Sequence, residues 1–228
     1  MTLDAVLWDM DGTLVDTEPV WWRAEIEIIT GLGGRWTVDD CKTLIGSDLH
    51  AAVEVWMARL PEGAISRTDL AAEVHGEVLR GLKAGVEFQP GALELLGALN
   101  GAGIPCALVS ASYRSMVDAV LSHCPPDVFT VSVAGDEVTH GKPHPEPYLT
   151  AARMLGADPA RCIVMEDSPP GANAGNASGA LVLAIPQHVP IPPAPRRVEV
   201  ESLTRLTPDT LRELATSSVD SVRGGLGR

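Results

Sequence analysis

Two aspartates near the start of the chain, Asp9 and Asp11, are the first residues whose types and spacing could do chemistry. They follow Ala5–Trp8, a continuous apolar run typical of a strand buried on both faces, so both carboxylates would lie at its carboxyl end. Two close carboxylates can hold a hard divalent cation, or they can divide the roles of nucleophile and general acid. Gly12 allows a tight turn after them, and Thr13 offers a hydroxyl group and an N–H. Solvated Asp-x-Asp pairs are common, so the interpretation depends on what else lies nearby.

Two serines, Ser110 and Ser112, follow the apolar run 104–109 and precede a segment with helical periodicity. A hydroxyl group together with free backbone N–H groups at a helix N-terminus can bind an anion such as phosphate. The alternative is that either serine serves only as the N-cap of that helix. Arg114 is a candidate for binding a distal group of a substrate, although it fits an ordinary position on a helix surface equally well.

Lys142 lies between Gly141 and Pro143, and the proline leaves the backbone around the lysine little freedom. An ammonium group fixed in this way could bind an anion, whereas most lysines are simply solvated. His140 and His144 flank this segment. With a glycine and a proline between them they do not fit a helical metal-binding pair, so the sequence gives no reason to assign them a role.

A second pair of acids, Glu166 and Asp167, follows the apolar run 162–165. If this run and Ala5–Trp8 are parallel strands of one sheet, these acids and Asp9 lie at the edge where open α/β sheets hold their functional sites. Several carboxylates in one crevice need a counter-charge, which a cation shared with Asp9 would supply.

Apolar runs and helical patterns alternate along most of the chain, which predicts an α/β fold with a doubly wound, Rossmann-like parallel sheet. The expected strands are Ala5–Trp8, 104–109, 128–133, 162–165 and 180–185, and the expected helices include 93–99, 116–121 and 148–155.

Residues 17–85 interrupt this alternation with helical patterns such as Leu49, Val53, Trp56 and Leu60, which share one apolar face. A set of ordinary crossover helices is the alternative, but the segment is long for one connection between strands. We therefore expect residues 1–16 and 86–228 to form the α/β core and residues 17–85 to be an all-α helical cap inserted after the first strand.

The 228-residue chain carries 17 Lys and Arg against 30 Asp and Glu, a formal net charge of −13. Such an acidic surface repels phosphate backbones and anionic lipids, so we expect no nucleic-acid partner and no membrane partner. The four cysteines form no C-x-x-C pair, which favours free thiols and a cytoplasmic location. We expect a monomer or a weak dimer.

The motifs together resemble the haloacid dehalogenase superfamily, in its branch of phosphatases and β-phosphoglucomutase-like proteins with a small helical cap. The segment 9–16 (DMDGTLVD), Ser110, Lys142 and the pair Glu166-Asp167 occur in that family's order, and the resemblance covers nearly the whole chain. Residues 17–85 lie where members of this branch carry their cap.

The resemblance implies a role for each motif residue. Asp9 would attack phosphorus as the nucleophile and form an aspartyl-phosphate, while Asp11 would act as general acid and then as general base. Ser110 and Lys142 would hold the oxygens of the transferring phosphoryl group. Gly12, Thr13, Ser112 and Arg114 are further candidates for phosphate or substrate binding.

The resemblance also implies Mg²⁺ as the cofactor. The ion would be held by the carboxylates of Asp9 and Asp167 and the backbone carbonyl of Asp11, with Glu166 near the metal or its waters. Octahedral Mg²⁺ that keeps several waters suits such a sparse set of oxygen ligands.

The acid at Asp11 fits work on phosphate esters, because the family's dehalogenases and phosphonate-cleaving members lack it. A Mg²⁺-dependent phosphatase acting on a small phosphorylated metabolite, a sugar or polyol phosphate, is therefore the main hypothesis. A phosphomutase of the β-phosphoglucomutase type is the alternative, but the family's mutases carry a cap arginine that the segment 46–50 (GSDLH) lacks. A non-catalytic sensor that binds a phosphorylated ligand is a third reading, opposed by the presence of every catalytic group.

Overall fold

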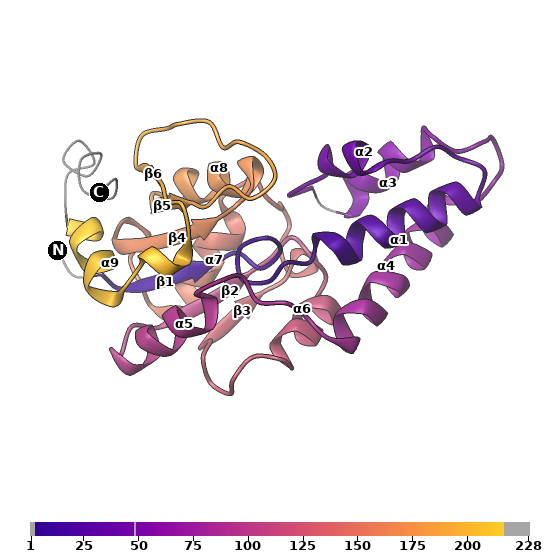
Figure 1. Cartoon of the computed structure of the whole chain (residues 1–228). Coiled ribbons are helices and arrows are strands. Elements are labelled where there is room, and N and C mark those ends of the chain that lie inside the picture. The colour runs from indigo at the N-terminus through magenta and orange to yellow at the C-terminus, as the bar shows by residue number, and fades with distance from the viewer. Residues whose placement is uncertain (1–2, 48, 217–228) are drawn as a thin grey trace.

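The computed structural model describes residues 3–47 and 49–216, and a six-stranded parallel sheet forms its centre (Figure 1). The strand order is β3-β2-β1-β4-β5-β6, so the first strand lies in the middle of the sheet. Direct pairing joins Val6 to both Cys106 and Ile163. The strands are β1 (Ala5–Trp8), β2 (Cys106–Val109), β3 (Val131–Val133), β4 (Cys162–Glu166), β5 (Leu181–Ala184) and β6 (Arg197–Glu199).

Helices cover both faces of this sheet. Helices α7 (Glu146–Leu155) and α8 (Pro169–Ala177) pack on one face, against Ala5 and Leu7 of β1. Helices α5 (Ala92–Gly101) and α9 (Pro208–Thr216) pack on the other, in the same apolar cluster as Val6 and Trp8. Alternate residues of β1 therefore enter two different cores, which is why the whole strand is apolar.

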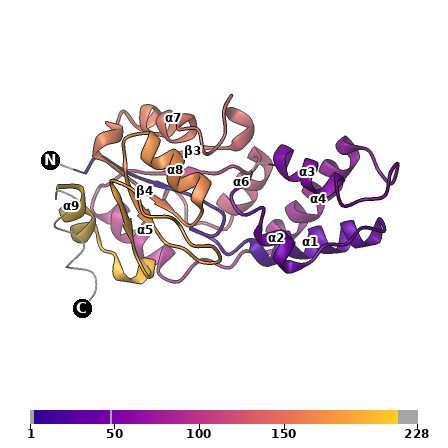
Figure 2. The same ribbon diagram turned by 90° about the horizontal axis from the view of Figure 1, so that it is seen from above.

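Four helices between β1 and α5 form a unit of their own beside the sheet. They are α1 (Glu18–Gly31), α2 (Val38–Lys42), α3 (Leu49–Met57) and α4 (Arg67–Ala84). Figures 1 and 2 show this four-helix unit extending away from the carboxyl ends of the strands. It meets the core where α4 packs against α6 (Arg114–Leu121). His75 of α4 lies 2.9 Å from the Ser115 hydroxyl of α6 across this contact.

The α/β fold and all five expected strands are confirmed, with shorter limits for three of them. Strand β6 was not expected, because only three residues after a proline-rich segment pair with β5. Helix α8 was not expected either, since its sequence is rich in small residues and lacks a clear apolar period. In the described part of the chain, no helix is both long and apolar enough to cross a membrane.

Candidate active site

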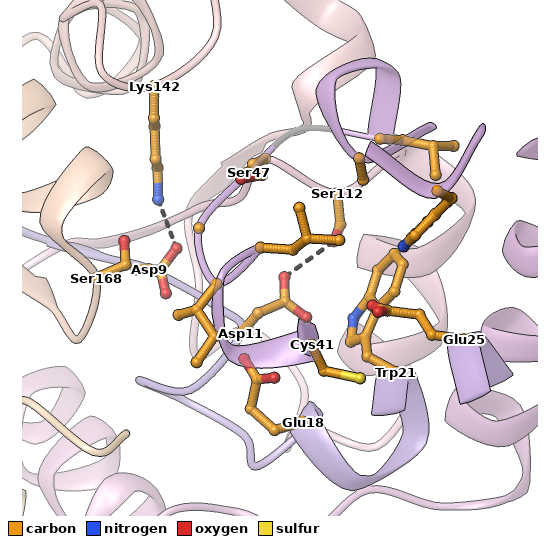
Figure 3. A pocket seen from close by; sticks show the side chains of 17 residues that line it. Asp9, Asp11, Glu18, Trp21, Glu25, Cys41, Ser47, Ser112, Lys142 and Ser168 are labelled. Atoms are coloured by element: carbon orange, nitrogen blue, oxygen red, sulfur yellow. Dashed lines mark hydrogen bonds and ion pairs between the residues drawn. The ribbon is translucent and has the colours of Figure 1, made fainter. Parts of the chain in front are cut away.

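The side chain of Lys142 joins three strands at the carboxyl edge of the sheet. Its Nζ donates to Oδ1 of Asp9 at 2.5 Å and to Oε1 of Glu166 at 2.7 Å, and it also donates to the Val109 carbonyl at 3.1 Å (Figure 3 shows the contact with Asp9). Asp9 follows β1, Glu166 ends β4 and Val109 ends β2. The lysine thus binds the ends of three adjacent strands, and all three of its N–H groups have acceptors.

Burial dominates the electrostatics of this contact, because Asp9 and Lys142 are only 6% and 7% exposed. Burial lowers the pKa of Lys142, but the Asp9 and Glu166 carboxylates outweigh it and hold that pKa above its ordinary value. Burial and the Glu166 carboxylate raise the pKa of Asp9 to about 8, although Lys142 opposes them. The charge of one ammonium group therefore does not fully compensate the negative charges of the acids around it.

Three buried carboxylates, those of Asp9, Glu166 and Asp167, lie close enough to share a cation, with one oxygen of each within 4.8 Å of the others. Burial and the neighbouring acids raise the pKa of Asp167 well above its ordinary value. Its Oδ1 accepts a hydrogen bond from the Thr13 hydroxyl at 3.2 Å, whereas its Oδ2 is buried without a partner. An orphaned carboxylate oxygen beside two more carboxylates fits a hard divalent cation.

Gly12 allows the turn after β1 to pass close to Asp167, because it has no side chain. Its φ is +84°, and a Cβ atom there would lie 2.1 Å from Oδ2 of Asp167. No other residue type fits both the backbone conformation and the space. The DxDG order is therefore tied to the position of Asp167.

Glu166 has supports that the sequence did not reveal. The Tyr148 hydroxyl of α7 donates to its Oε1 at 2.6 Å, and the Ser168 hydroxyl donates to its Oε2 at 2.9 Å. Tyr148 is fully buried and belongs to one of the expected helices. Only the packing of α7 on the sheet brings its hydroxyl to β4, and the sequence assigned that hydroxyl no role.

Asp11 is held by three hydroxyl groups. Thr17 donates to its Oδ1 at 2.8 Å, and Ser110 and Ser112 donate to its Oδ2 at 3.0 and 2.9 Å. The structure therefore brings both expected serines to the site, but their hydroxyls point at a carboxylate (Figure 3 draws the bond from Ser112). Ser110 Oγ also accepts the backbone N–H of Ser112 at 2.9 Å. The sequence did not mark Thr17, which follows Asp11 by six residues.

Arg114 lies outside this arrangement. Its guanidinium forms ion pairs with Glu137 and Asp118 and donates to the Ser132 hydroxyl at 2.8 Å. Arg114 is not among the described residues that line the pocket over Asp9 and Asp11. The structure thus gives it a role in joining α6 to the segment after β3, and we do not retain it as a substrate-binding residue.

A pocket of about 660 Å³, part of it open to solvent, extends from Asp9 to the four-helix unit. Its wall on that side includes Glu18, Trp21 and Glu25 of α1 (Figure 3). Burial raises the pKa of Glu18 to about 8, and burial raises that of Glu25 to about 7. Among the described lining residues, Lys142 has the only basic side chain, against four acids, Asp9, Asp11, Glu18 and Glu25. The sequence did not mark Glu18 or Glu25.

Known proteins resemble this chain over most of its length. Hexitol phosphatase B from Escherichia coli O157:H7 is 32% identical over 212 residues, which cover 89% of this chain and 94% of that protein. The crystal structure of a CbbY variant from Rhodobacter sphaeroides in complex with xylulose-(1,5)bisphosphate superimposes with a TM-score of 0.77 at 25% identity, covering 90% of this chain and 96% of that one.

A third relative shows the fold. The structure of β-phosphoglucomutase from Clostridium difficile has a TM-score of 0.79 at 21% identity, with 93% of this chain and 97% of that chain covered. The family model for haloacid dehalogenase-like hydrolases matches residues 3–179, a range that includes Asp9, Lys142 and the acids that end β4. The chain is therefore an enzyme of the haloacid dehalogenase-like hydrolase family.

Proposed function

We propose that the protein is a Mg²⁺-dependent phosphatase that hydrolyses a small sugar or polyol phosphate through an aspartyl-phosphate on Asp9. The observation that carries this proposal is the position of Asp9, which lies at the base of the pocket, bound to Lys142 and beside two further buried acids. The named relatives of the chain support the reaction class, since one is a hexitol phosphatase.

Each residue near Asp9 has a step to perform in this proposal. A carboxylate oxygen of Asp9 attacks phosphorus, and the bond to the leaving oxygen breaks. Asp11 donates a proton to that oxygen and then accepts one from the water that hydrolyses the aspartyl-phosphate. The hydroxyls of Ser112 and Thr17 hold the Asp11 carboxyl in place for both transfers.

Lys142 supplies fixed positive charge where the phosphoryl oxygens gather negative charge. Its three N–H groups are taken by Asp9, Glu166 and the Val109 carbonyl, so a phosphoryl oxygen would replace the contact with Asp9 as that residue attacks. The Ser110 hydroxyl, which has one proton to donate, would turn from Asp11 to bind a second oxygen of the group. Mg²⁺, held by Asp9, Asp167 and the Asp11 carbonyl with Glu166 beside them, would neutralise charge on the transferring group.

The side chains of the pocket favour a neutral, hydroxyl-rich leaving group. Lys142 is the only basic residue among the described lining residues, so a second phosphate or a carboxylate on the substrate would find no second cation to pair with. The segment 46–50 also has no arginine, although its Asp48 lies outside the described residues. These features support a monophosphate substrate and oppose a mutase that must grip two phosphates.

The four-helix unit would act as the cap, with the domain limits expected from the sequence, residues 17–85 against 1–16 and 86–228; residues 1–2 and 217–228 of the core lie outside the described part. Cap closure over Asp9 would exclude water from the first step. Four free cysteines, three of them buried, support a location in the cytoplasm, and the protein would work there as a monomer or weak dimer.

Hydrolysis of an aryl phosphate in the presence of Mg²⁺ tests the proposal. The Asp9→Asn variant is expected to lose at least about 10³-fold in kcat, because the amide is not a nucleophile for phosphorus. Asp39→Asn, which changes an exposed acid on α2, is the matched control and should keep full activity. Unchanged turnover by Asp9→Asn would overturn the proposal.

A panel of phosphorylated metabolites then separates the alternatives. Release of inorganic phosphate from sugar and polyol monophosphates is the expected outcome. A coupled assay that detects isomerisation of a hexose 1-phosphate without phosphate release would identify a phosphomutase. Absence of turnover with every compound, despite Mg²⁺ binding, would identify a phospho-ligand sensor.

A further inference from the structure

A second cluster of metal-binding side chains lies on the outer side of the segment that carries Lys142. It consists of His140, His144 and Glu146, whose ligand atoms lie within 4.8 Å of one another. The segment is not helical there. A turn closed by the His144 N–H and the Gly141 carbonyl at 2.9 Å brings the two histidines to the same side. Their ring centroids are 4.7 Å apart.

The spacing of the ligand atoms is close to what one ion requires. Nδ1 of His140 lies 2.9 Å from Oε2 of Glu146, and Nδ1 of His144 lies 4.0 Å from the same oxygen. Metal–ligand bonds of about 2.0–2.1 Å in a tetrahedral site place neighbouring ligand atoms roughly 3.4 Å apart. The two distances lie on either side of this value, so small side-chain rotations would complete the geometry.

Accessibility and preorganisation both favour binding. The side chains of His140 and His144 are 62% and 52% exposed, so an ion can reach them directly from solvent. Glu146 begins α7 and is fixed by the backbone N–H groups of Thr139 and His140, at 2.8 and 3.0 Å. An ion bound through Nδ1 of both histidines would replace the hydrogen bond between His140 Nδ1 and Glu146 Oε2 at 2.9 Å. It would also displace the 3.2 Å hydrogen bond that His144 Nδ1 accepts from the Glu146 N–H, and solvent can then satisfy that amide.

We propose that His140, His144 and Glu146 form a binding site for a divalent transition-metal ion, Zn²⁺, Ni²⁺ or Cu²⁺. Two imidazoles and one carboxylate are ligands that these ions prefer, whereas Mg²⁺ prefers an all-oxygen set. The site is distinct from the buried acids beside Asp9, and it does not depend on the proposed phosphatase activity.

The position of the site gives it a structural consequence. Its ligands lie two residues before, two residues after and four residues after Lys142. An ion bound there cross-links both sides of the lysine in the conformation that meets Asp9. Binding to the folded chain alone stabilises that chain by mass action. Zn²⁺ should therefore raise the melting temperature.

Copper binding to the full chain without an affinity tag tests the proposal. Cu²⁺ is titrated in the presence of saturating Mg²⁺, and its electron paramagnetic resonance spectrum is recorded. The expected result is one Cu²⁺ per chain with nitrogen hyperfine structure from imidazole, which the carboxylates around Asp9 cannot produce. His140→Ala and His144→Ala should each weaken this binding by about tenfold or more, whereas His188→Ala, at an exposed histidine outside the cluster, should bind as the wild type does.

Glu146→Gln provides a second, milder variant that keeps an oxygen to accept the N–H groups of Thr139 and His140. It should weaken Cu²⁺ binding and reduce the rise in melting temperature caused by Zn²⁺. The proposal is overturned if the double variant His140→Ala/His144→Ala binds Cu²⁺ with the stoichiometry, affinity and nitrogen hyperfine structure of the wild type. It is likewise overturned if the wild type shows no imidazole-bound Cu²⁺.

Discussion

The ammonium group of Lys142 and the carboxylate of Asp9 are 2.5 Å apart, although 133 residues separate them in the chain and both side chains are almost completely buried. A buried ion pair contributes little net stability when it forms, but losing one partner leaves a buried charge without compensation. In this protein the same ammonium group also compensates part of the negative charge of Glu166. Stability and the proposed catalysis therefore depend on one nitrogen atom.

Replacement of Lys142 by methionine should destabilise the fold strongly. The variant keeps a side chain of similar length but leaves Asp9 and Glu166 buried without their ammonium partner. We expect a loss of about 3–5 kcal/mol in the free energy of unfolding near pH 7. The loss should shrink at acid pH, where protonation removes the unpaired charges. Urea unfolding at two pH values measures both effects.

Lys42→Met is the control for this experiment. Lys42 makes an exposed ion pair with Asp39, three residues before it in α2. Exposed pairs of this kind contribute at most about 1 kcal/mol. A loss of similar size in both lysine variants would contradict the special role of Lys142.

The hydroxyl groups around Asp11 predict a dependence on the leaving group. If Asp11 protonates the leaving oxygen, Asp11→Asn should lower kcat for an alkyl phosphate by about 10²–10⁴-fold. An aryl phosphate leaves as a stable phenolate and should be affected much less in its first step. Single-turnover measurements with the two substrates isolate that step. Equal losses for both would show that Asp11 does not act as the acid.

The sequence predicted the parts of this site that depend on strand order. Asp9 and Asp11 follow β1, and Glu166 and Asp167 come at the end of β4, so a parallel sheet was enough to bring them together. Lys142 was predicted as a site residue from its flanking glycine and proline, but its reach to Glu166 was not. The family resemblance supplied the roles, and the structure supplies the contacts.

Residues placed by packing between distant segments could not be predicted. Tyr148 reaches Glu166 only because α7 packs on this part of the sheet, and Glu25 reaches the pocket only because α1 lies over it. For Arg114 the sequence left two readings open, substrate binding and an ordinary helix-surface position, and it did not indicate the contacts of its guanidinium with Glu137 and Asp118. A single sequence carries no information on such pairings.

Glu25 should make the stability of the protein fall as pH rises. Burial raises its pKa from about 4.5 when unfolded to about 7 in the folded chain, so the folded state binds more protons between these values. The penalty is absent below pH 4.5 and complete above pH 7, where it reaches at most about 3 kcal/mol. Glu25→Gln removes the charge but keeps an acceptor for the indole N–H of Trp36, now 2.8 Å away.

We therefore expect Glu25→Gln to be more stable than the wild type by about 1–3 kcal/mol at pH 8 and by less than about 1 kcal/mol at pH 5. Denaturant unfolding at both pH values checks this difference. Glu27→Gln, which changes an exposed residue of the same helix, should show no such dependence on pH. A stability gain for Glu25→Gln that is equal at both pH values would contradict the argument.

Gly171 should be the most sensitive glycine for the position of Glu166. A Cβ atom at residue 171 would lie 1.6 Å from Oε1 of Glu166, the oxygen that accepts from both Lys142 and Tyr148. Gly171→Ala must therefore displace a buried carboxylate together with its partners. We expect it to destabilise the fold by at least about 1–3 kcal/mol. It should also lower phosphatase activity, because Lys142 loses the group that orients it.

Gly97→Ala is the matched control, since residue 97 is an exposed position of α5 where a Cβ atom meets nothing within 4 Å. That change should stabilise the protein by about 0.5–1 kcal/mol and leave activity unchanged. Full stability and full activity in Gly171→Ala would show that the Glu166 carboxylate can shift without loss of either property. That result would contradict a role for Glu166 in the site.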